Sequence, residues 1–224
     1  MIGTIVNTGA VLAGSLAGLA AGRRLPERIK DILMQALGLC VLYIGVKMSL
    51  EAKNALPTIA CVLLGAITGE VLGVEKGLER LAGWLKSSLK FQSPTFVQGF
   101  VTASVMYLTG PMTILGCIKD GVAQDASILY IKSLFDMIGA LALSSAMGVG
   151  VMFSAASVLF VQGALTLGAH HLGFLQRPEV LEAVTSTGGV LIVGIGLNIL
   201  DLKKIRVGNF LPALVYAIIG ALYF

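Results

Sequence analysis

Long apolar runs separated by short polar segments dominate the hydropathy pattern of this chain. A helix of about 20 apolar residues is long enough to cross the hydrocarbon core of a bilayer, about 30 Å thick. The pattern therefore predicts an all-α polytopic membrane protein with about eight transmembrane helices. The expected spans are residues 2–21, 32–50, 56–74, 94–118, 126–148, 149–169, 184–200 and 208–224.

The longest polar stretch, residues 75–93, has a different pattern. Leucines and Trp84 occupy one helical face of this stretch, and lysines, glutamates and Arg80 occupy the other. Such a segment is typical of an amphipathic helix that lies in the membrane interface with a tryptophan anchor.

Composition agrees with a membrane protein. Of the 224 residues, 56% are hydrophobic and 12% are charged, and the mean hydropathy is +0.91. Soluble domains carry about 25% charged residues, so the lipid bilayer is the expected surrounding and no water-soluble domain fits between the spans. The net charge of +4 does not indicate nucleic acid, because basic residues of membrane proteins gather on the cytoplasmic side.

Basic residues alternate between successive loops of the predicted spans. The odd-numbered loops carry eleven Lys and Arg residues, Arg23, Arg24 and Lys90 among them, and the even-numbered loops carry three. Eight helices with both termini outside satisfy the positive-inside rule. The fifth loop, near Gly148, is uncharged. If residues 126–169 formed one span with a re-entrant piece, the count would be seven.

The two ends of the chain repeat a pattern of Gly, Ala and Pro, which divides the chain into four segments. Residues 1–74 form a first three-helix copy, 75–93 the interfacial helix, 94–148 a central helix pair and 149–224 a second copy. The copies lie five spans apart, an odd number, so the second should be inverted in the membrane, as in many secondary transporters. The matching positions are Gly9, Gly14, Gly38, Gly45, Pro57 and Gly65 against Gly163, Gly168, Gly189, Gly196, Pro212 and Gly220.

Small residues recur at every fourth position in two predicted helices. Gly14, Gly18 and Gly22 form one stripe, and residues 65, 69 and 73 form the other. Such stripes let helix backbones approach closely. They indicate packing within the chain or, alternatively, a homodimer interface.

Candidate chemistry lies between the copies. Lys132 and Asp136 fall inside an apolar span at i, i+4 spacing, which places them on one helical face with Ser133 nearby. A charge in mid-helix costs about 2.5–3.5 kcal/mol on insertion scales, so it must be paired or face a polar cavity. An intramembrane carboxylate can bind a cation or carry a proton, and the alternative is a buried pair that only fixes packing.

A helix break is predicted at Thr109-Gly110-Pro111, because Pro111 lacks an N–H and clashes with the carbonyl of Tyr107. Freed carbonyls need partners in lipid, and discontinuous helices supply ion-binding carbonyls in transporters. The alternative is a kink that serves packing. Thr109 and Thr113 could add hydroxyl ligands, and Lys119-Asp120-Gly121 ends the helix as a turn.

Three further polar residues complete the candidate site. Glu70 lies near the cytoplasmic end of its span, where it either snorkels to water or faces a vestibule. Asn7 and Gln162 are amides inside spans, where hydrogen bonding between helices is the usual role.

Enzyme signatures such as G-x-S-x-G, H-E-x-x-H and the Walker motif are missing from the sequence. His170 and His171 are adjacent, so they do not share a helix face as zinc ligands would. We therefore expect no catalytic residues, no cofactor and no resident metal.

Several motifs resemble the YqgA/YdfK family of bacterial membrane proteins. They are Gly110-Pro111-Met112-Thr113-Ile114, Asp120-Gly121, Lys132-Ser133 with Asp136, Phe160-Val161-Gln162-Gly163, and the opening Ile2-Gly3-Thr4 with Asn7. The resemblance covers essentially the whole chain. It implies a location in the bacterial inner membrane, a sodium channel or pump as one function, and an association with biofilm formation. Thr113 departs from the small apolar residue expected there.

The sequence thus favours an inner-membrane transport protein for a small cation, sodium or proton, or for a solute coupled to one. Asp136 would bear the cation and Lys132 would modulate it. A passive channel and a non-transporting structural or signalling protein are the alternatives.

Overall fold

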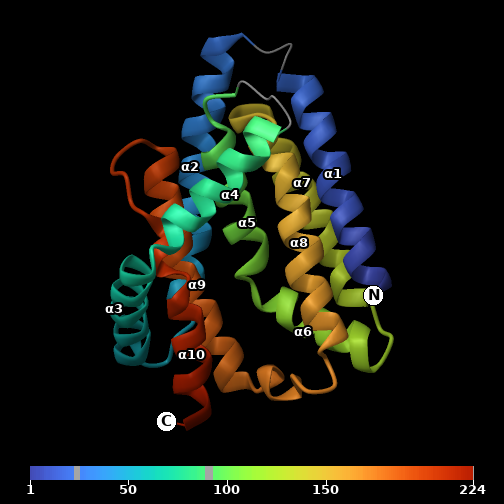
Figure 1. The fold of residues 1–224 in the computed structure, drawn as a ribbon, viewed down its shortest axis with the longest axis vertical. Helices are drawn as coiled ribbons and strands as arrows, with labels where there is room; N and C mark the ends of the chain where they lie inside the picture. Colours follow the sequence, from blue (N-terminus) through green and yellow to red (C-terminus); the bar gives the residue numbers. More distant parts are fainter. Residues whose placement is uncertain (23–25, 89–92, 224) are drawn as a thin grey trace. The chain divides into compact units, whose positions relative to one another are not determined.

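The computed structural model describes residues 1–22, 26–88 and 93–223. These ranges form ten α-helices and two short 3-10 helices, with no strand among them (Figure 1). The elements are α1 (Ile2–Gly22), α2 (Glu27–Ser49), α3 (Ala55–Leu72), α4 (Val74–Ser88), α5 (Phe96–Leu108), α6 (Pro111–Val122), α7 (Ser127–Met147), α8 (Gly150–Leu167), η1 (Gly173–Gln176), α9 (Pro178–Ile199), η2 (Val207–Phe210) and α10 (Pro212–Tyr223).

Six of the described helices are long and apolar enough to cross a membrane. They are α1, α2, α3, α7, α8 and α9. The predicted span 94–118 is a pair of helices, α5 and α6, bent by 63° at the predicted break, and counting the pair as one span gives seven. The predicted span 208–224 corresponds to η2 and α10, a shorter apolar segment. The all-helical class is confirmed, and the count of eight stays a prediction.

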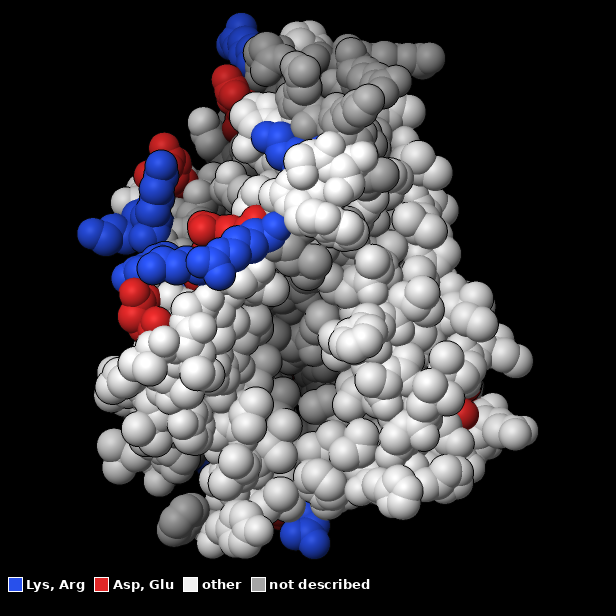
Figure 2. Space-filling model, in the orientation of Figure 1, with Lys and Arg blue, Asp and Glu red and all other residues white. Residues whose placement is uncertain are grey.

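The amphipathic stretch forms α4, which covers the described part of the predicted 75–93 up to Ser88. Trp84 lies exposed on this helix. Residues 89–92 lie outside the described residues, as do Arg23 and Arg24 of the first basic cluster. In the face drawn in Figure 2, uncharged residues cover most of the surface, and the charged residues gather in a few groups.

The chain divides into two compact units, each made of segments from distant parts of the sequence. Unit 1 comprises Met1–Leu33 and Ala82–Gln176, and unit 2 comprises Met34–Leu81 and Arg177–Phe224. Unit 1 therefore contains the first helix of each predicted copy together with the central helices. Unit 2 contains the second and third helices of each copy, with α2 included from Met34 onward.

Within unit 1, α1 packs against α7 through its glycine stripe (Figure 1). A Cβ at Gly14, Gly18 or Gly22 would overlap the backbone carbonyl of α7 opposite it, so a larger residue cannot fit. The opposing carbonyls belong to Met137, Leu141 and Ser145. Residue numbers rise together in the two helices, so they run parallel. This stripe is used inside the chain, and a homodimer would need another surface.

Unit 2 is built on two antiparallel helix pairs, α2 with α9 and α3 with α10. The second stripe serves the latter pair: Gly65 packs on Ala213, and Gly69 packs on the carbonyl of Asn209. Gly73 instead ends α3 with a left-handed φ of 64° and open space around it. The chain can turn there from α3 directly into α4 because glycine adopts positive φ at no steric cost.

Candidate functional site

Lys132 and Asp136 form an ion pair on the inner face of α7. Nζ of Lys132 donates to Oδ2 of Asp136, and the side chains are only 6% and 9% exposed. Both residues lie well inside the 21-residue helix. Isolated charges at this depth would be costly, and pairing with a further hydrogen bond offsets part of that cost.

Asn7 of α1 connects this pair to α8. Its Nδ2 donates to Oδ2 of Asp136 at 2.9 Å and to Oε1 of Gln162 at 3.2 Å. Both amide residues are fully buried. Asn7 of α1, the Lys132–Asp136 pair of α7 and Gln162 of α8 therefore form one polar cluster, here named the Asp136 cluster.

Tyr107 of α5 covers the same face of α7. Its ring centroid lies 5.9 Å from Nζ of Lys132, and its hydroxyl approaches the Cα side of Gly139. Positions 132, 136 and 139 share one helical face, so the ring flanks the Asp136 carboxylate. Tyr107 is 2% exposed. It was not among the residues predicted from the sequence, because an aromatic in an apolar run reads as core.

Several polar atoms of this region have no hydrogen-bond partner among the described residues. They are Oδ1 of Asn7, Nε2 of Gln162, the hydroxyl of Tyr107 and Oγ1 of Thr109, and all four are buried. A buried polar atom without a partner costs about 1–3 kcal/mol. Three of these atoms belong to side chains that surround the Lys132–Asp136 pair, so the cluster has spare hydrogen-bonding capacity for a small ligand or for water.

The break between α5 and α6 lies where the sequence predicts it. Gly110 is extended (φ −82°, ψ 149°) and precedes α6, which begins at Pro111. Oγ1 of Thr113 donates to the carbonyl of Tyr107 at 3.0 Å. Pro111 has no N–H to donate to this carbonyl, so the Thr113 hydroxyl replaces the missing helical hydrogen bond. It is therefore not directed at the Asp136 cluster.

Two other predicted residues are engaged elsewhere. Oγ of Ser133 donates to the carbonyl of Leu129, one turn back on its own helix. Oδ2 of Asp120 accepts the backbone N–H of Gly3 at 3.1 Å and lies 2.9 Å from the amine of Met1. Asp120 therefore holds the N-terminal end of α1, where a carboxylate is favoured by the helix dipole.

Thr4 and Thr166 were missed in the sequence. Their hydroxyls lie 3.1 Å apart, and both side chains are buried between α1 and α8. Thr4 precedes Asn7 by one turn, and Thr166 follows Gln162 by one turn, so two successive polar contacts join these antiparallel helices. A polar residue at i, i+3 or i+4 from a candidate amide is the signal that could have revealed them.

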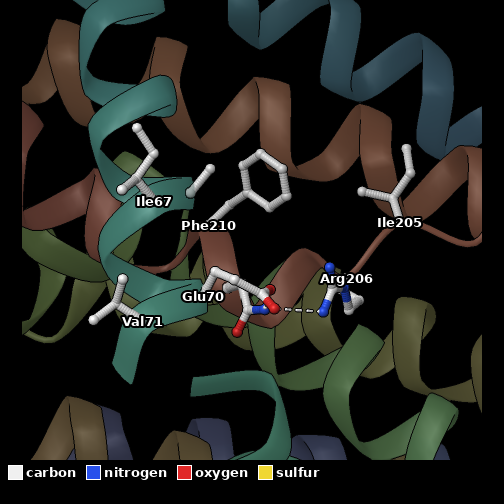
Figure 3. A pocket seen from close by; sticks show the side chains of 8 residues that line it. Ile67, Glu70, Val71, Ile205, Arg206 and Phe210 are labelled. Atoms are coloured by element: carbon white, nitrogen blue, oxygen red, sulfur yellow. Dashed lines mark hydrogen bonds and ion pairs between the residues drawn. The ribbon is translucent and has the colours of Figure 1, made fainter. Parts of the chain in front are cut away.

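Glu70 lies in unit 2 and joins a separate network (Figure 3). Its Oε1 pairs with Nη1 of Arg206 at 2.7 Å, and its Oε2 accepts from Nδ2 of Asn209 at 2.7 Å. Asn209 also accepts the N–H of Glu75 through Oδ1 at 2.7 Å. Glu70 is thus neither snorkelling alone nor part of the Asp136 cluster.

This network lines a cavity of about 510 Å³ between α3 and the segment that leads into η2. Its other walls are apolar, with Ile67, Val71 and Phe210 among them. At the start of α4, burial raises the pKa of the Glu75 carboxyl, and a hydrogen bond from the N–H of Gly208 partly opposes this. The contacts join the end of α3 and the start of α4 to η2.

Comparison with known proteins places the chain among uncharacterised bacterial relatives. A family model described as "Protein of unknown function (DUF554)" matches residues 2–222. The "Uncharacterized protein YqgA" of Escherichia coli K12 is 31% identical over 97% of this chain and 94% of its own length. The "Uncharacterized membrane protein YdfK" of Bacillus subtilis 168 is 28% identical over 96% of this chain and 93% of its own. No solved structure matches.

Proposed function

The chain belongs to the DUF554 family of membrane proteins, and from that premise we propose that it transports a small monovalent cation across the bacterial inner membrane. The Asp136 cluster is the proposed binding site. Sodium and the proton are the proposed cargoes, either alone or coupled to a small solute.

One observation carries this proposal: a buried carboxylate is surrounded by polar atoms that have no hydrogen-bond partner among the described residues. Oδ1 of Asn7 is a carbonyl oxygen with no donor among the described residues, and it belongs to a residue that also contacts Asp136. Hard monovalent cations prefer carboxylate and carbonyl oxygens. A purely structural ion pair would not require such spare oxygen atoms.

The charges of the cluster favour a monovalent cation. Asp136 is the one carboxylate in the cluster, and Lys132 already neutralises it. An arriving cation must therefore compete with the lysine ammonium for the same carboxylate. Lys132 thereby limits affinity, which a transport site needs if the cation is to leave again.

Contacts within unit 2 support the proposed inverted repeats. Residues 38, 42, 45 and 49 of α2 correspond in spacing to 189, 193 and 196 of α9 and to residue 200 directly after it. Gly38 packs on Leu200, and its counterpart Gly189 packs on Ser49; Gly45 packs on Val193, and its counterpart Gly196 packs on Leu42. Exchanging the two helices leaves this set of contacts unchanged, as a pseudo-two-fold axis requires.

The corresponding helices of both units are antiparallel. In unit 1, Thr4 meets Thr166 and Asn7 meets Gln162, so numbers rise in α1 as they fall in α8. In unit 2, Gly65 meets Ala213 and Gly69 meets Asn209. Inverted copies of this kind underlie alternating access in many transporters, and we propose the same here.

Cation flux in proteoliposomes tests the function. Asp136→Asn should abolish cation-dependent uptake, and sodium, potassium and protons would be screened. Asp125→Asn, in the exposed turn before α7, is the control and should leave uptake unchanged. Full uptake by Asp136→Asn would contradict the assignment. Single-channel currents in place of slow saturable uptake would identify a passive channel instead.

A further inference from the structure

Tyr107 lies beside Lys132, the residue that the transported cation would displace from Asp136. We propose that Tyr107 is a positioning residue: it receives the Lys132 ammonium when the transported cation occupies Asp136. This inference rests on the proposed function, because Lys132 needs a new partner only when a cation replaces it at Asp136.

Displacement leaves the Lys132 ammonium without its anion. In the apolar interior of unit 1, an ammonium with no partner is too costly to be tolerated. The side chain is 6% exposed, so water does not replace the lost carboxylate. A second group that can bind the ammonium must therefore lie within reach of Nζ before a cation can bind at Asp136.

Tyr107 can bind the Lys132 ammonium in two ways. Its ring face attracts a cation, and Nζ of Lys132 already lies 5.9 Å from the ring centroid, at the outer limit of an effective cation–π distance of about 6 Å. Its hydroxyl is buried and has no partner among the described residues, so its lone pairs are free to accept from the ammonium. Most of the attraction is thus still unused while Lys132 contacts Asp136.

The groups around Lys132 offer no equal alternative. Asn7 and Gln162 present spare atoms on the side of α1 and α8, but Oδ1 of Asn7 is the oxygen proposed for the cation, and the free atom of Gln162 is a donor. On α6, the Cys117 thiol interacts electrostatically with Lys132 but is a weak acceptor, and Asp120 is bound to the start of α1. Tyr107 alone among these combines a cation-attracting face with a free acceptor.

A double-mutant cycle on purified protein tests the inference, with sodium binding measured by equilibrium uptake of radioactive sodium. Tyr107→Leu removes the ring and the hydroxyl and should weaken sodium binding about tenfold; Tyr107→Phe keeps the ring and should lie between. In a Lys132→Gln background, which retains a donor to Asp136 but has no ammonium, Tyr107→Leu should have no effect. Tyr130→Leu, on the exposed face of α7, is the matched control.

The outcomes separate the two proposals. Tyr107 does not bind the displaced ammonium if Tyr107→Leu weakens sodium binding equally with and without Lys132, or if it changes nothing in the wild-type background. Either result leaves the proposed site at Asp136 intact. If the wild type binds no sodium, this inference is overturned. If its proteoliposomes also show no Asp136-dependent proton flux, the proposed function fails with it. Thermal unfolding of each variant shows that it is folded before binding is compared.

Discussion

The side-chain amide of Asn7 donates a 2.9 Å hydrogen bond to Oδ2 of Asp136, joining α1 to α7 across 129 positions of sequence. The same amide holds Gln162 of α8 at 3.2 Å. One residue therefore ties three helices of unit 1 together at the level of the ion pair. Its replacement should affect both stability and cation binding.

Asn7→Leu should destabilise the protein by about 1–3 kcal/mol, because buried acceptors on Asp136 and Gln162 lose their donor. Cation uptake should fall together with stability. Denaturant unfolding in detergent measures the first and proteoliposome flux the second. Thr8→Ala is the control, since the Thr8 hydroxyl donates to the carbonyl of Thr4 in its own helix. Wild-type stability for Asn7→Leu would show that the bridge contributes nothing.

Gly14→Val should disrupt the packing of α1 on α7. The new Cβ would overlap the carbonyl of Met137, and overpacking of this kind costs about 1–3 kcal/mol or more. Gly9→Val introduces the same residue on the same helix, where no atom of the described residues lies within 4 Å of the new Cβ, so it should be close to neutral. The melting temperatures of the two variants give the comparison. Equal melting temperatures would mean that the close approach at Gly14 does not exist.

Thr113→Val should destabilise the protein at the break between α5 and α6. Valine has nearly the shape of threonine but cannot donate to the carbonyl of Tyr107, and an unpaired buried carbonyl costs about 1–3 kcal/mol. Thr113→Ser retains the hydroxyl and should keep most of the stability. Because the carbonyl belongs to Tyr107, sodium binding should also change in the valine variant. A stable, fully active Thr113→Val protein would refute this role.

Glu75→Gln should alter the pH dependence of stability. Burial raises the pKa of Glu75 above its ordinary value of 4.5, so the folded protein holds this proton more tightly than the unfolded chain. Wild-type stability should therefore gain a contribution as the pH falls through the raised pKa, and lose it as the pH rises. Thermal unfolding from pH 4 to 7 should show that contribution in the wild type and in the exposed control Glu51→Gln, but not in Glu75→Gln.

Reporter fusions test the orientation of the helices. With eight spans and both ends outside, a fusion at Gly148 should report the cytoplasm, and fusions at Arg177 and at the C-terminal residue 224 should report the outside. The basic residues after α9, Lys203, Lys204 and Arg206, then lie inside. A cytoplasmic C-terminus would overturn the count and the inversion of the second copy.

The sequence by itself determined the features that depend on neighbouring residues. Apolar runs of sufficient length predicted the helices, and Gly110-Pro111 predicted the break because proline excludes a helical hydrogen bond wherever it occurs. The i, i+4 spacing of Lys132 and Asp136 placed them on one face without knowledge of the fold. These predictions rest on local geometry, and the structure agrees with each of them.

Only the tertiary structure decided which distant residues meet. The helices are apolar on nearly all sides, so hydrophobic periodicity does not indicate which face packs inward. It was the packing of α1 between α7 and α8 that brought Asn7 to Asp136 and Gln162, and the bend before α6 that left Tyr107 over Lys132. Tertiary packing also decided the partner of Glu70: within unit 2 it meets Arg206, which lies 136 positions away in the sequence.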